Sequence, residues 1–262
     1  MYKILGKSFD TEKEYLDFVV ENEEMIIDEK KSSIKYADAF SFNTVSIDKG
    51  FDITQKASDQ DATELLVKIA INTTNVIDSH DDMHVKGIWN KSIKERGNKV
   101  LHLQEHKRSF DAVISRGEDL KVYAKDTTWN NLGFDLKGDT QALMFDSLVK
   151  QDVNEFMFKQ YQKGNVTEHS VGMQYVKMAT CIDNEDYPVQ KENWDKYVVE
   201  VANKESLDGR KIFWAVTEAK VIEGSSVLMG SNSFTPTVST STKQETENKL
   251  KDKAIVEWLK RQ

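Results

Sequence analysis

Glu168-His169-Ser170-Val171-Gly172-Met173-Gln174-Tyr175 is a strand-like run in which a hydroxyl group and a glycine share one face, because side chains two residues apart along a strand point to the same side. Two further strand-like runs carry complementary groups. One upstream ends at His106, and one downstream contains Glu218 and Glu223. A nucleophile, a base and a carboxylate on three strands that we expect to lie side by side predict a serine hydrolase site, with the chain order His, Ser, Glu.

The expected chemistry assigns one role to each residue. A serine hydroxyl is a poor nucleophile until a base removes its proton, and the imidazole of His106 is suited to do so for Ser170 near neutral pH. The imidazole in turn needs a carboxylate that fixes its tautomer and stabilises its charged form. The developing oxyanion needs backbone N–H donors, and Gly172 allows a close approach of the backbone at that point.

Two glutamates compete for the third position. Strand alternation places Glu223 on one face with Val221 and Ser225, which are apolar or small, whereas Glu218 shares its face with Lys220 and is expected to face solvent. We therefore favour Glu223. Glu218 stays open, because a break in this strand near its end would change the alternation.

Other candidate groups have a structural interpretation beside the functional one. His169 adjoins Ser170 and is a second candidate base, but neighbouring strand residues point to opposite faces. Asp78, His80 and His84 could ligate a metal ion. Their loop is equally suited to side chains that bond their own backbone, so we expect neither a metal nor an organic cofactor.

Composition excludes several classes of function. The chain has 262 residues, of which 39% are hydrophobic and 31% charged, and its net charge is −8. An acidic chain is a poor general binder of nucleic acid, which requires a basic face. No apolar run is long enough for a transmembrane helix, and the first residues resemble no secretory segment. Cys181 is the only cysteine, so no internal disulfide is expected, and a structural role is expected for it rather than a catalytic one. These features favour the cytoplasm.

Apolar periodicity predicts an α+β fold that is mostly β. Helical spacing favours helices over residues 11–30, 152–162 and 190–205, with a short one within 85–95. Strands are expected at 64–71, 99–105, 110–115, 120–125, 141–147, 169–178 and 211–229. The segment 231–246 is rich in Ser and Thr, contains Pro236 and predicts a flexible linker, and 248–261 predicts an amphipathic helix. The expected organisation is an N-terminal helical appendage (1–62), a catalytic core (63–235) and a C-terminal linker plus helix (236–262).

The order of these pieces resembles the prohead, or capsid-maturation, serine proteases of tailed phages. The resemblance spans residues 64–235 approximately, and four stretches carry it. They are Val76–Asp82 followed by Gly87–Ile93, Leu103-Gln104-Glu105-His106, His169-Ser170-Val171-Gly172-Met173, and Val221-Ile222-Glu223-Gly224-Ser225-Ser226-Val227. Met173 stands where the family usually has Phe, and Gly230-Ser231-Asn232 stands where it has Pro-Ala-Asn.

The resemblance implies a fold like that of herpesvirus assemblins, a small β-barrel surrounded by helices. It also implies that His106 is the base, that Ser170 is the nucleophile and that the third member is acidic. The expected function is a serine endopeptidase in the host bacterial cytoplasm, inside the procapsid. It would process scaffolding segments, the major capsid protein and its own termini, without nucleic acid or membrane as partner, and self-association stays open. The alternative is an inactive, protease-like scaffold or capsid assembly protein.

Overall fold

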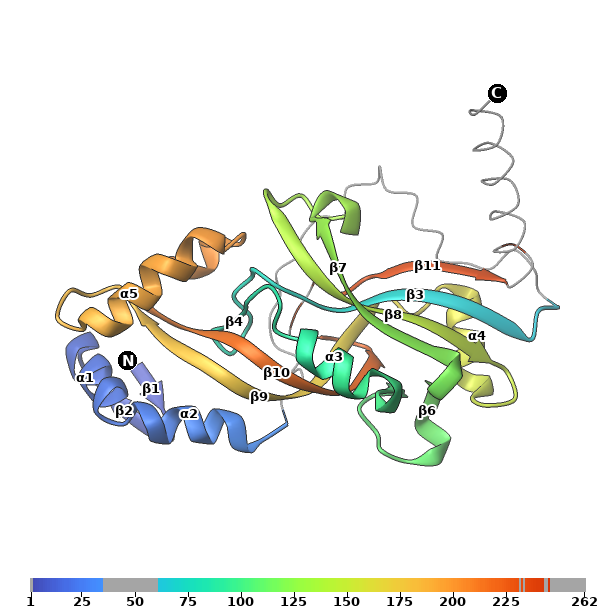
Figure 1. Cartoon of the computed structure of the whole chain (residues 1–262), viewed down its shortest axis with the longest axis horizontal. Helices are drawn as coiled ribbons and strands as arrows, with labels where there is room; N and C mark the ends of the chain where they lie inside the picture. The colour runs from blue at the N-terminus through green and yellow to red at the C-terminus, as the bar shows by residue number, and fades with distance from the viewer. Residues whose placement is uncertain (1, 35–60, 231, 233, 243–244, 246–262) are drawn as a thin grey trace, which may run out of the picture.

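The computed structural model describes residues 2–34, 61–230, 232, 234–242 and 245. This part of the chain is α+β, with more residues in strands than in helices. It contains a five-stranded sheet, a four-stranded sheet and a short N-terminal hairpin, with helices around them (Figure 1). Within the described residues, no helix has the length and apolar character needed to cross a bilayer.

The five-stranded sheet is mixed. Its strands are β4 (Asp82–His84), β10 (Ile212–Val227), β5 (Leu101–Gln104), β6 (Val113–Arg116) and β9 (Glu168–Ile182). Strand β9 pairs antiparallel with β10 over nearly its whole length, whereas β4 and β5 both run parallel to β10. At the end that contains Ser170, the strands therefore lie side by side in the order β9, β10, β5, β6.

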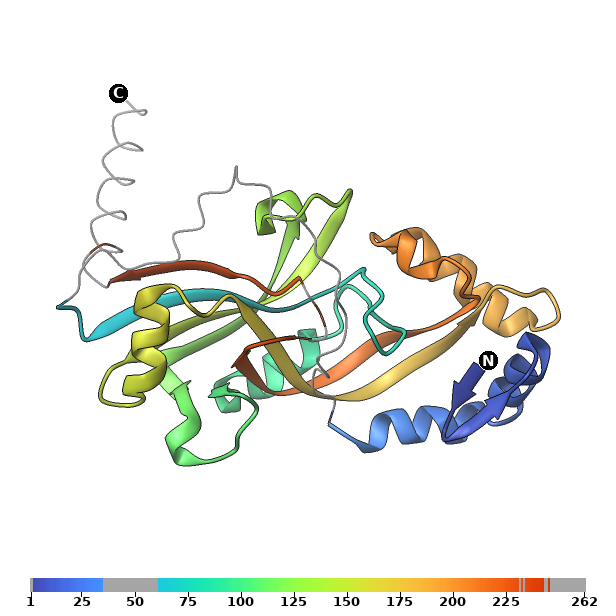
Figure 2. The same cartoon turned by 180° about the vertical axis from the view of Figure 1, so that it is seen from behind.

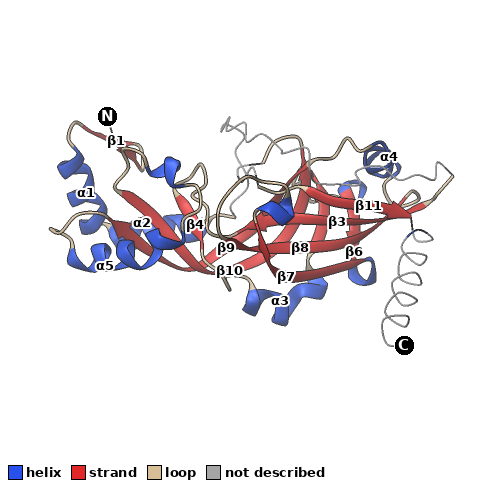
Figure 3. Ribbon diagram, turned by 90° about the horizontal axis from the view of Figure 1, so that it is seen from above, coloured by secondary structure: helices blue, strands red, loops and turns tan. Residues whose placement is uncertain are grey.

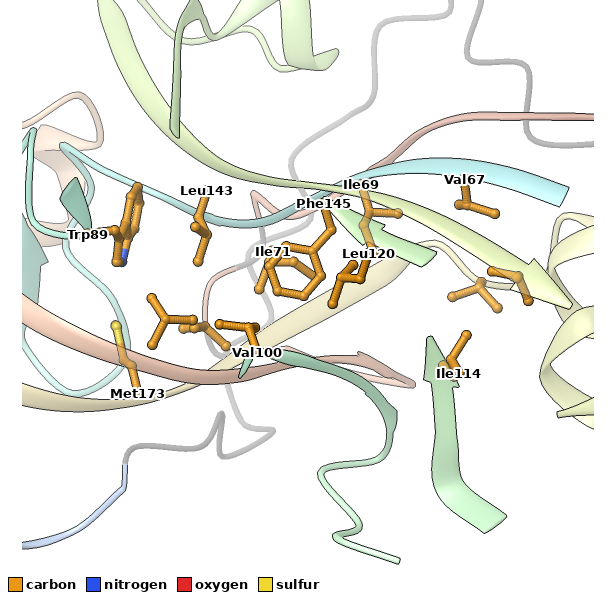
Figure 4. Close-up of a cluster of buried hydrophobic side chains, with 14 of the residues drawn as sticks. Val67, Ile69, Ile71, Trp89, Val100, Ile114, Leu120, Leu143, Phe145 and Met173 are labelled. Atoms are coloured by element: carbon orange, nitrogen blue, oxygen red, sulfur yellow. The ribbon is translucent and has the colours of Figure 1, made fainter. Parts of the chain in front are cut away.

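The four-stranded sheet is antiparallel throughout and packs against the first sheet. Its order is β11 (Thr237–Thr242), β3 (Glu64–Thr73), β8 (Asp139–Lys150) and β7 (Leu120–Thr128). Apolar side chains from both sheets meet in the main core, among them Ile71, Phe145 and Met173 (Figure 4). Each large side chain buried there contributes about 1.5–3 kcal/mol.

Two helices complete the main core. Helix α3 (Asn90–Arg96) follows the buried Trp89, and α4 (Glu155–Lys163) buries Phe158 and Tyr161. The Asn154 side chain accepts from the Met157 N–H at 3.0 Å and begins α4, and Gly164, at φ 72°, ends it. The helix predicted over 152–162 is therefore confirmed.

A second apolar cluster lies at the far end of β9 and β10, beside the N-terminal elements (Figure 2). Those elements are β1 (Tyr2–Ile4), β2 (Lys7–Phe9), α1 (Glu12–Glu21) and α2 (Glu23–Ser32). Helix α5 (Pro188–Tyr197) lies beside them, and its Gln190 side chain donates to Glu23 at 2.8 Å. Thr11 begins α1 with a capping box, as its sequence suggests. The single helix predicted over 11–30 is wrong, because the side chain of Asn22 bonds the Phe18 carbonyl at 2.8 Å and the chain restarts as α2.

Lys30 links the N-terminal elements to the sheets. Its Nζ donates to Asp82 Oδ1 at 2.5 Å, and it lies 4.1 Å from the ring centroid of Trp214. Asp82 is fully buried, and its second carboxylate oxygen accepts from the hydroxyl of Tyr175 at 2.9 Å. A buried carboxylate is tolerated only when its charge is compensated.

Replacing Lys30 with alanine should lower the free energy of unfolding by about 3 kcal/mol, because Asp82 would stay buried without its cation. Lys31→Ala is the matched control: within the described residues, no ion pair engages the Lys31 side chain, and only its backbone carbonyl accepts a bond, from Gln174. Urea denaturation of both variants measures the difference. Equal stabilities would show that the pair does not anchor α2.

The described strands do not close into the small β-barrel that the resemblance implies. An isolated bridge between Glu168 and Pro236 joins the two sheets at one corner, but no ladder in this part of the chain joins β6 to β7. Strand β6 has only four residues, and the chain turns from it through Gly117–Asp119 directly into β7. The result is an open pair of sheets, beyond which β9 and β10 extend as a long ribbon (Figure 3).

Three other expectations need correction. Thr237–Thr242, placed in a flexible linker, form β11 and pair with β3. The helix expected over 190–205 ends at Tyr197, and short 3-10 turns follow. Strand β10 continues through Gly224, and the irregularity near its end is a β-bulge at Ile222 rather than a break. The predicted C-terminal helix, 248–261, lies outside the described residues.

Candidate active site

Four strands of the five-stranded sheet present one outer face, opposite the main core. Gly224 of β10 faces the main core, because a Cβ added there would come within 2.6 Å of the Phe145 ring. Residues on either side of Gly224 along β10 therefore point outward. These are Glu223 and Ser225, and their cross-strand partners on β9 are Gly172 and Ser170. The predicted nucleophile, glycine and acid thus share one face of two paired strands.

His106 reaches this face from a tight turn rather than from a strand. Strand β5 ends at Gln104, and the Lys107 N–H donates to the Gln104 carbonyl at 3.0 Å. Glu105 and His106 have φ values of 51° and 55°, a left-handed pair that resembles the centre of a type I′ turn. Such conformations cost non-glycine residues of order 1 kcal/mol or more each. The turn directs His106 back over the end of β10.

The His106 imidazole is held by Glu223. Nδ1 lies 2.7 Å from Glu223 Oε1, and the Glu223 side chain is 1% exposed. A carboxylate oxygen accepts, so Nδ1 carries the hydrogen and Nε2 is the nitrogen that can take a proton. Glu223 therefore fixes the tautomer required of a general base.

Ser225 holds both members of this pair. Its hydroxyl donates to Glu223 Oε2 at 2.6 Å and accepts from the backbone N–H of His106 at 3.1 Å. It is a positioning residue that sequence reasoning did not assign. Its signal was present in the sequence, because Ser225 is two residues from Glu223 on the same strand and so shares its face.

Gly172 leaves the space that Glu223 occupies. An added Cβ at Gly172 would lie 2.0 Å from Glu223 Oε1 and 2.8 Å from its carboxyl carbon. The glycine is therefore required for the carboxylate to reach His106. The predicted contribution of this backbone to an oxyanion site stays a prediction.

Ser170 lies directly across the ladder from Ser225 and is 5% exposed. Opposed residues on an antiparallel pair have Cβ atoms about 4.5–5.5 Å apart on the same face. Because Ser225 contacts both His106 and Glu223, Ser170 is one cross-strand neighbour away from the pair. The transfer of a proton from Ser170 to His106 belongs to the proposed function below.

Glu218, the alternative acid, lies elsewhere. Its carboxylate pairs with Lys177 at 2.7 Å and with Lys91 at 3.3 Å. These two lysines lower the pKa of Glu218 through hydrogen bonds and charge. Of the two glutamates, it is therefore Glu223 that contacts His106.

The side-chain alternation expected along β10 is wrong between Val221 and Glu223. Glu223 was expected to share a face with Val221, but Val221 is buried in the main core. A β-bulge between Val221 and Glu223 inserts Ile222 and reverses the alternation. The bulge turns Glu223 to the outer face, beside His106.

His169, the rival base, points into the core. Its Nε2 lies 3.1 Å from the hydroxyl of Tyr161, and its Nδ1 lies 2.9 Å from the Thr235 carbonyl oxygen. The hydroxyl of Tyr161 also bonds Ser226, which in turn contacts His102. Both histidines are fully buried, so this second group of serine and histidine side chains gives a substrate no access.

Burial lowers the pKa of His169 to about 4. A histidine whose folded pKa lies below the unfolded value near 6.5 makes the fold less stable as pH falls through that range. Between pH 7 and pH 5, His169 should therefore remove up to about 2 kcal/mol of the free energy of unfolding. His169→Gln should show a correspondingly shallower loss in urea denaturation at the two pH values. Parallel losses in both proteins would contradict this assignment.

The candidate metal loop does not assemble ligands. Oδ1 of Asp78 accepts the backbone N–H groups of His80 and Asp82 at 2.8 and 3.0 Å, as the structural interpretation of the loop expects. Burial and the charge of Asp82 raise the pKa of Asp78 to about 7. His84 is buried between Asn72 and Tyr175. No group of potential ligands gathers anywhere in the described part of the chain.

Cys181 is buried and donates weakly to the Ala179 carbonyl at 3.8 Å. Burial raises the pKa of its thiol to about 12, so it stays protonated at neutral pH and is a poor nucleophile. The expected structural role fits this environment.

Comparison of the chain with protein-family models, with curated proteins and with solved structures finds no significant match. The class of site is therefore defined by geometry alone: a partly buried histidine bonded to a buried carboxylate, beside a serine on the adjacent strand.

Proposed function

We propose that this protein is a serine endopeptidase in which Ser170 is the nucleophile, His106 the general base and Glu223 the orienting acid. The observation that carries the proposal is the 2.7 Å contact of His106 Nδ1 with the buried Glu223. It leaves Nε2 as the basic nitrogen, and the register of β9 and β10 places Ser170 on the same face.

The mechanism is acyl transfer in two balanced steps. His106 Nε2 takes the hydroxyl proton as Ser170 Oγ bonds to the peptide carbonyl carbon. The C–N bond then breaks, and the imidazolium returns that proton to the leaving amine. Water repeats the sequence on the acyl-enzyme and releases a carboxylic acid and free Ser170. Glu223 stabilises the imidazolium in both steps.

The substrate and location come from the resemblance of the sequence to prohead proteases. The proposed substrates are scaffolding segments, the amino-terminal arm of a major capsid protein and the chain's own termini. The proposed location is the procapsid in a bacterial cytoplasm. The proposal also includes a relation in fold to the herpesvirus assemblins.

Co-expression with the cognate capsid protein tests this function. We expect new capsid-protein termini with the wild-type chain and none with Ser170→Ala or His106→Ala, as mapped by mass spectrometry. Thr180→Ala is the matched control, because Thr180 is a hydroxyl residue of the same strand whose partner, Trp214, is remote from Glu223 in the register. Unchanged processing by Ser170→Ala would leave the alternative, a protease-like assembly protein without catalytic activity.

A further inference from the structure

A pocket of about 330 Å³ opens beside the candidate triad on the same face of the sheet. Glu223 lines the pocket and is also a member of the candidate triad. Leu101 and Leu103 of β5 form part of its floor, and they pair with Glu223 and Ser225 in the parallel ladder. Residues so paired point to the same face, so the pocket is continuous with the site of the proposed reaction.

The pocket is basic although the chain as a whole is acidic. Of its eleven lining residues, four are cations and only Glu223 is acidic. The cations are Arg96, Lys99, Arg108 and Arg116. Glu223 is already engaged by His106 and Ser225, so its charge does not neutralise the four.

Three of the cations are available to a ligand. Within the described residues, no ion pair engages Arg96, Lys99 or Arg116, and the buried Nε of Arg96 has no hydrogen-bond partner there. An arginine donor that is buried without a partner is costly. A carboxylate that enters the pocket would supply the acceptor and the opposite charge.

Apart from Ser109, the rest of the lining is apolar. Val113 lies on the floor, and Phe110 stands 85% exposed at the rim with the guanidinium of Arg116 5.9 Å from its ring centroid. An occupant with a short aliphatic stem and a terminal carboxylate matches both parts of the lining.

We infer that this pocket binds an acidic side chain, Glu or Asp, of the peptide that the enzyme cleaves. The inference rests on the proposed function and adds a substrate class to it. Neighbouring strands are about 4.8 Å apart, so β5 lies about 10 Å from Ser170 on β9. An extended peptide spans about 3.3–3.6 Å per residue, which places the acidic residue within about four residues of the cleaved bond.

A peptide library in which every position holds all amino acids in equal amounts tests this assignment. The cleavage products are identified by mass spectrometry. We expect an acidic residue to be enriched at one position within four residues of the cut. For the best peptide, exchange of that Glu for Gln should lower kcat/KM at least about tenfold. The reversed variant Arg116→Glu should lose this preference and cut the matching Lys peptide better than the Glu peptide. That gain cannot arise from misfolding.

Lys196→Gln is the control, because Lys196 lies on α5 at the other end of the molecule (Figure 1) and should keep the wild-type ratio. Cleavage without an acidic preference, or a preference that survives Arg116→Glu combined with Arg96→Glu, would overturn the pocket assignment and leave the proposed function standing. If the wild-type chain cuts no peptide in the library, the proposed function fails and the pocket assignment fails with it.

Discussion

Glu223→Gln should lower the rate of peptide cleavage by about 10³–10⁴-fold while the protein stays folded. The amide is neutral, so it cannot stabilise the imidazolium that forms when His106 takes the proton of Ser170. Its NH₂ group can also donate to Nδ1, which would move the hydrogen to Nε2 and leave no basic nitrogen toward the serine. Steady-state kinetics with a cleaved peptide measures the loss.

Glu218→Gln provides the matched control for that experiment. Glu218 lies on the same strand but pairs with Lys91 and Lys177 at the surface, so its replacement should change the rate by less than about twofold. Thermal unfolding of both variants checks that the fold persists. Equal rate losses in the two variants, or full activity in Glu223→Gln, would show that Glu223 does not serve the reaction.

The second large effect is expected for Gly172→Ala. A methyl group there would lie 2.0 Å from Glu223 Oε1, so the carboxylate must move away from His106. Misplacement of a catalytic group by about 1 Å can cost about 100-fold in rate. We expect a loss of that size or more in kcat, with little change in the melting temperature, because the displaced group is the end of a side chain.

Two other glycines separate this effect from general damage. A Cβ at Gly97 would meet only Ile93, at 3.8 Å, so Gly97→Ala should keep the wild-type stability. A Cβ at Gly224 would lie 2.6 Å from the Phe145 ring in the core, so Gly224→Ala should lower stability. If Gly172→Ala keeps full activity, the carboxylate does not need its present position.

Much of this site could be predicted from sequence because strand alternation is a local signal. Ser170 and Gly172 are two residues apart on a run that forms a single strand, β9, and this places them on one face. The other two members of the candidate triad are His106, which follows a short strand, and Glu223, which precedes a glycine. The resemblance to prohead proteases brought these weak local patterns together in one order.

The remainder depended on contacts between distant segments. The bulge at Ile222 decides which face Glu223 takes, and it arises from the pairing of β9 with β10. The left-handed backbone of Glu105 and His106 could not be predicted from sequence, because no Gly or Asn marks the turn and the modest enrichment of His in this conformation is too weak a signal. The basic pocket gathers side chains from α3, β6 and the loops between them, whose proximity follows only from the assembled sheet.

The strand β11 shows how tertiary pairing overrides composition. A segment rich in Ser and Thr is typical of a linker, yet Thr237–Thr242 pair with β3. Threonine has good β propensity, and the exposed edge of β3 offers unpaired backbone groups. The open arrangement of the two sheets also depends on distant contacts. The short β6 and the turn after it leave no ladder to β7.

Covalent labelling of the folded protein with a fluorophosphonate tests the central claim most directly. Attack by an activated serine forms an O–P bond, breaks the P–F bond and releases fluoride, and the displaced hydroxyl proton passes to the imidazole. We predict a single adduct, mapped by peptide mass spectrometry to Ser170, whose formation slows by orders of magnitude in His106→Ala. An adduct on another residue, or a folded wild-type chain that forms none, would contradict the activation of Ser170 by His106.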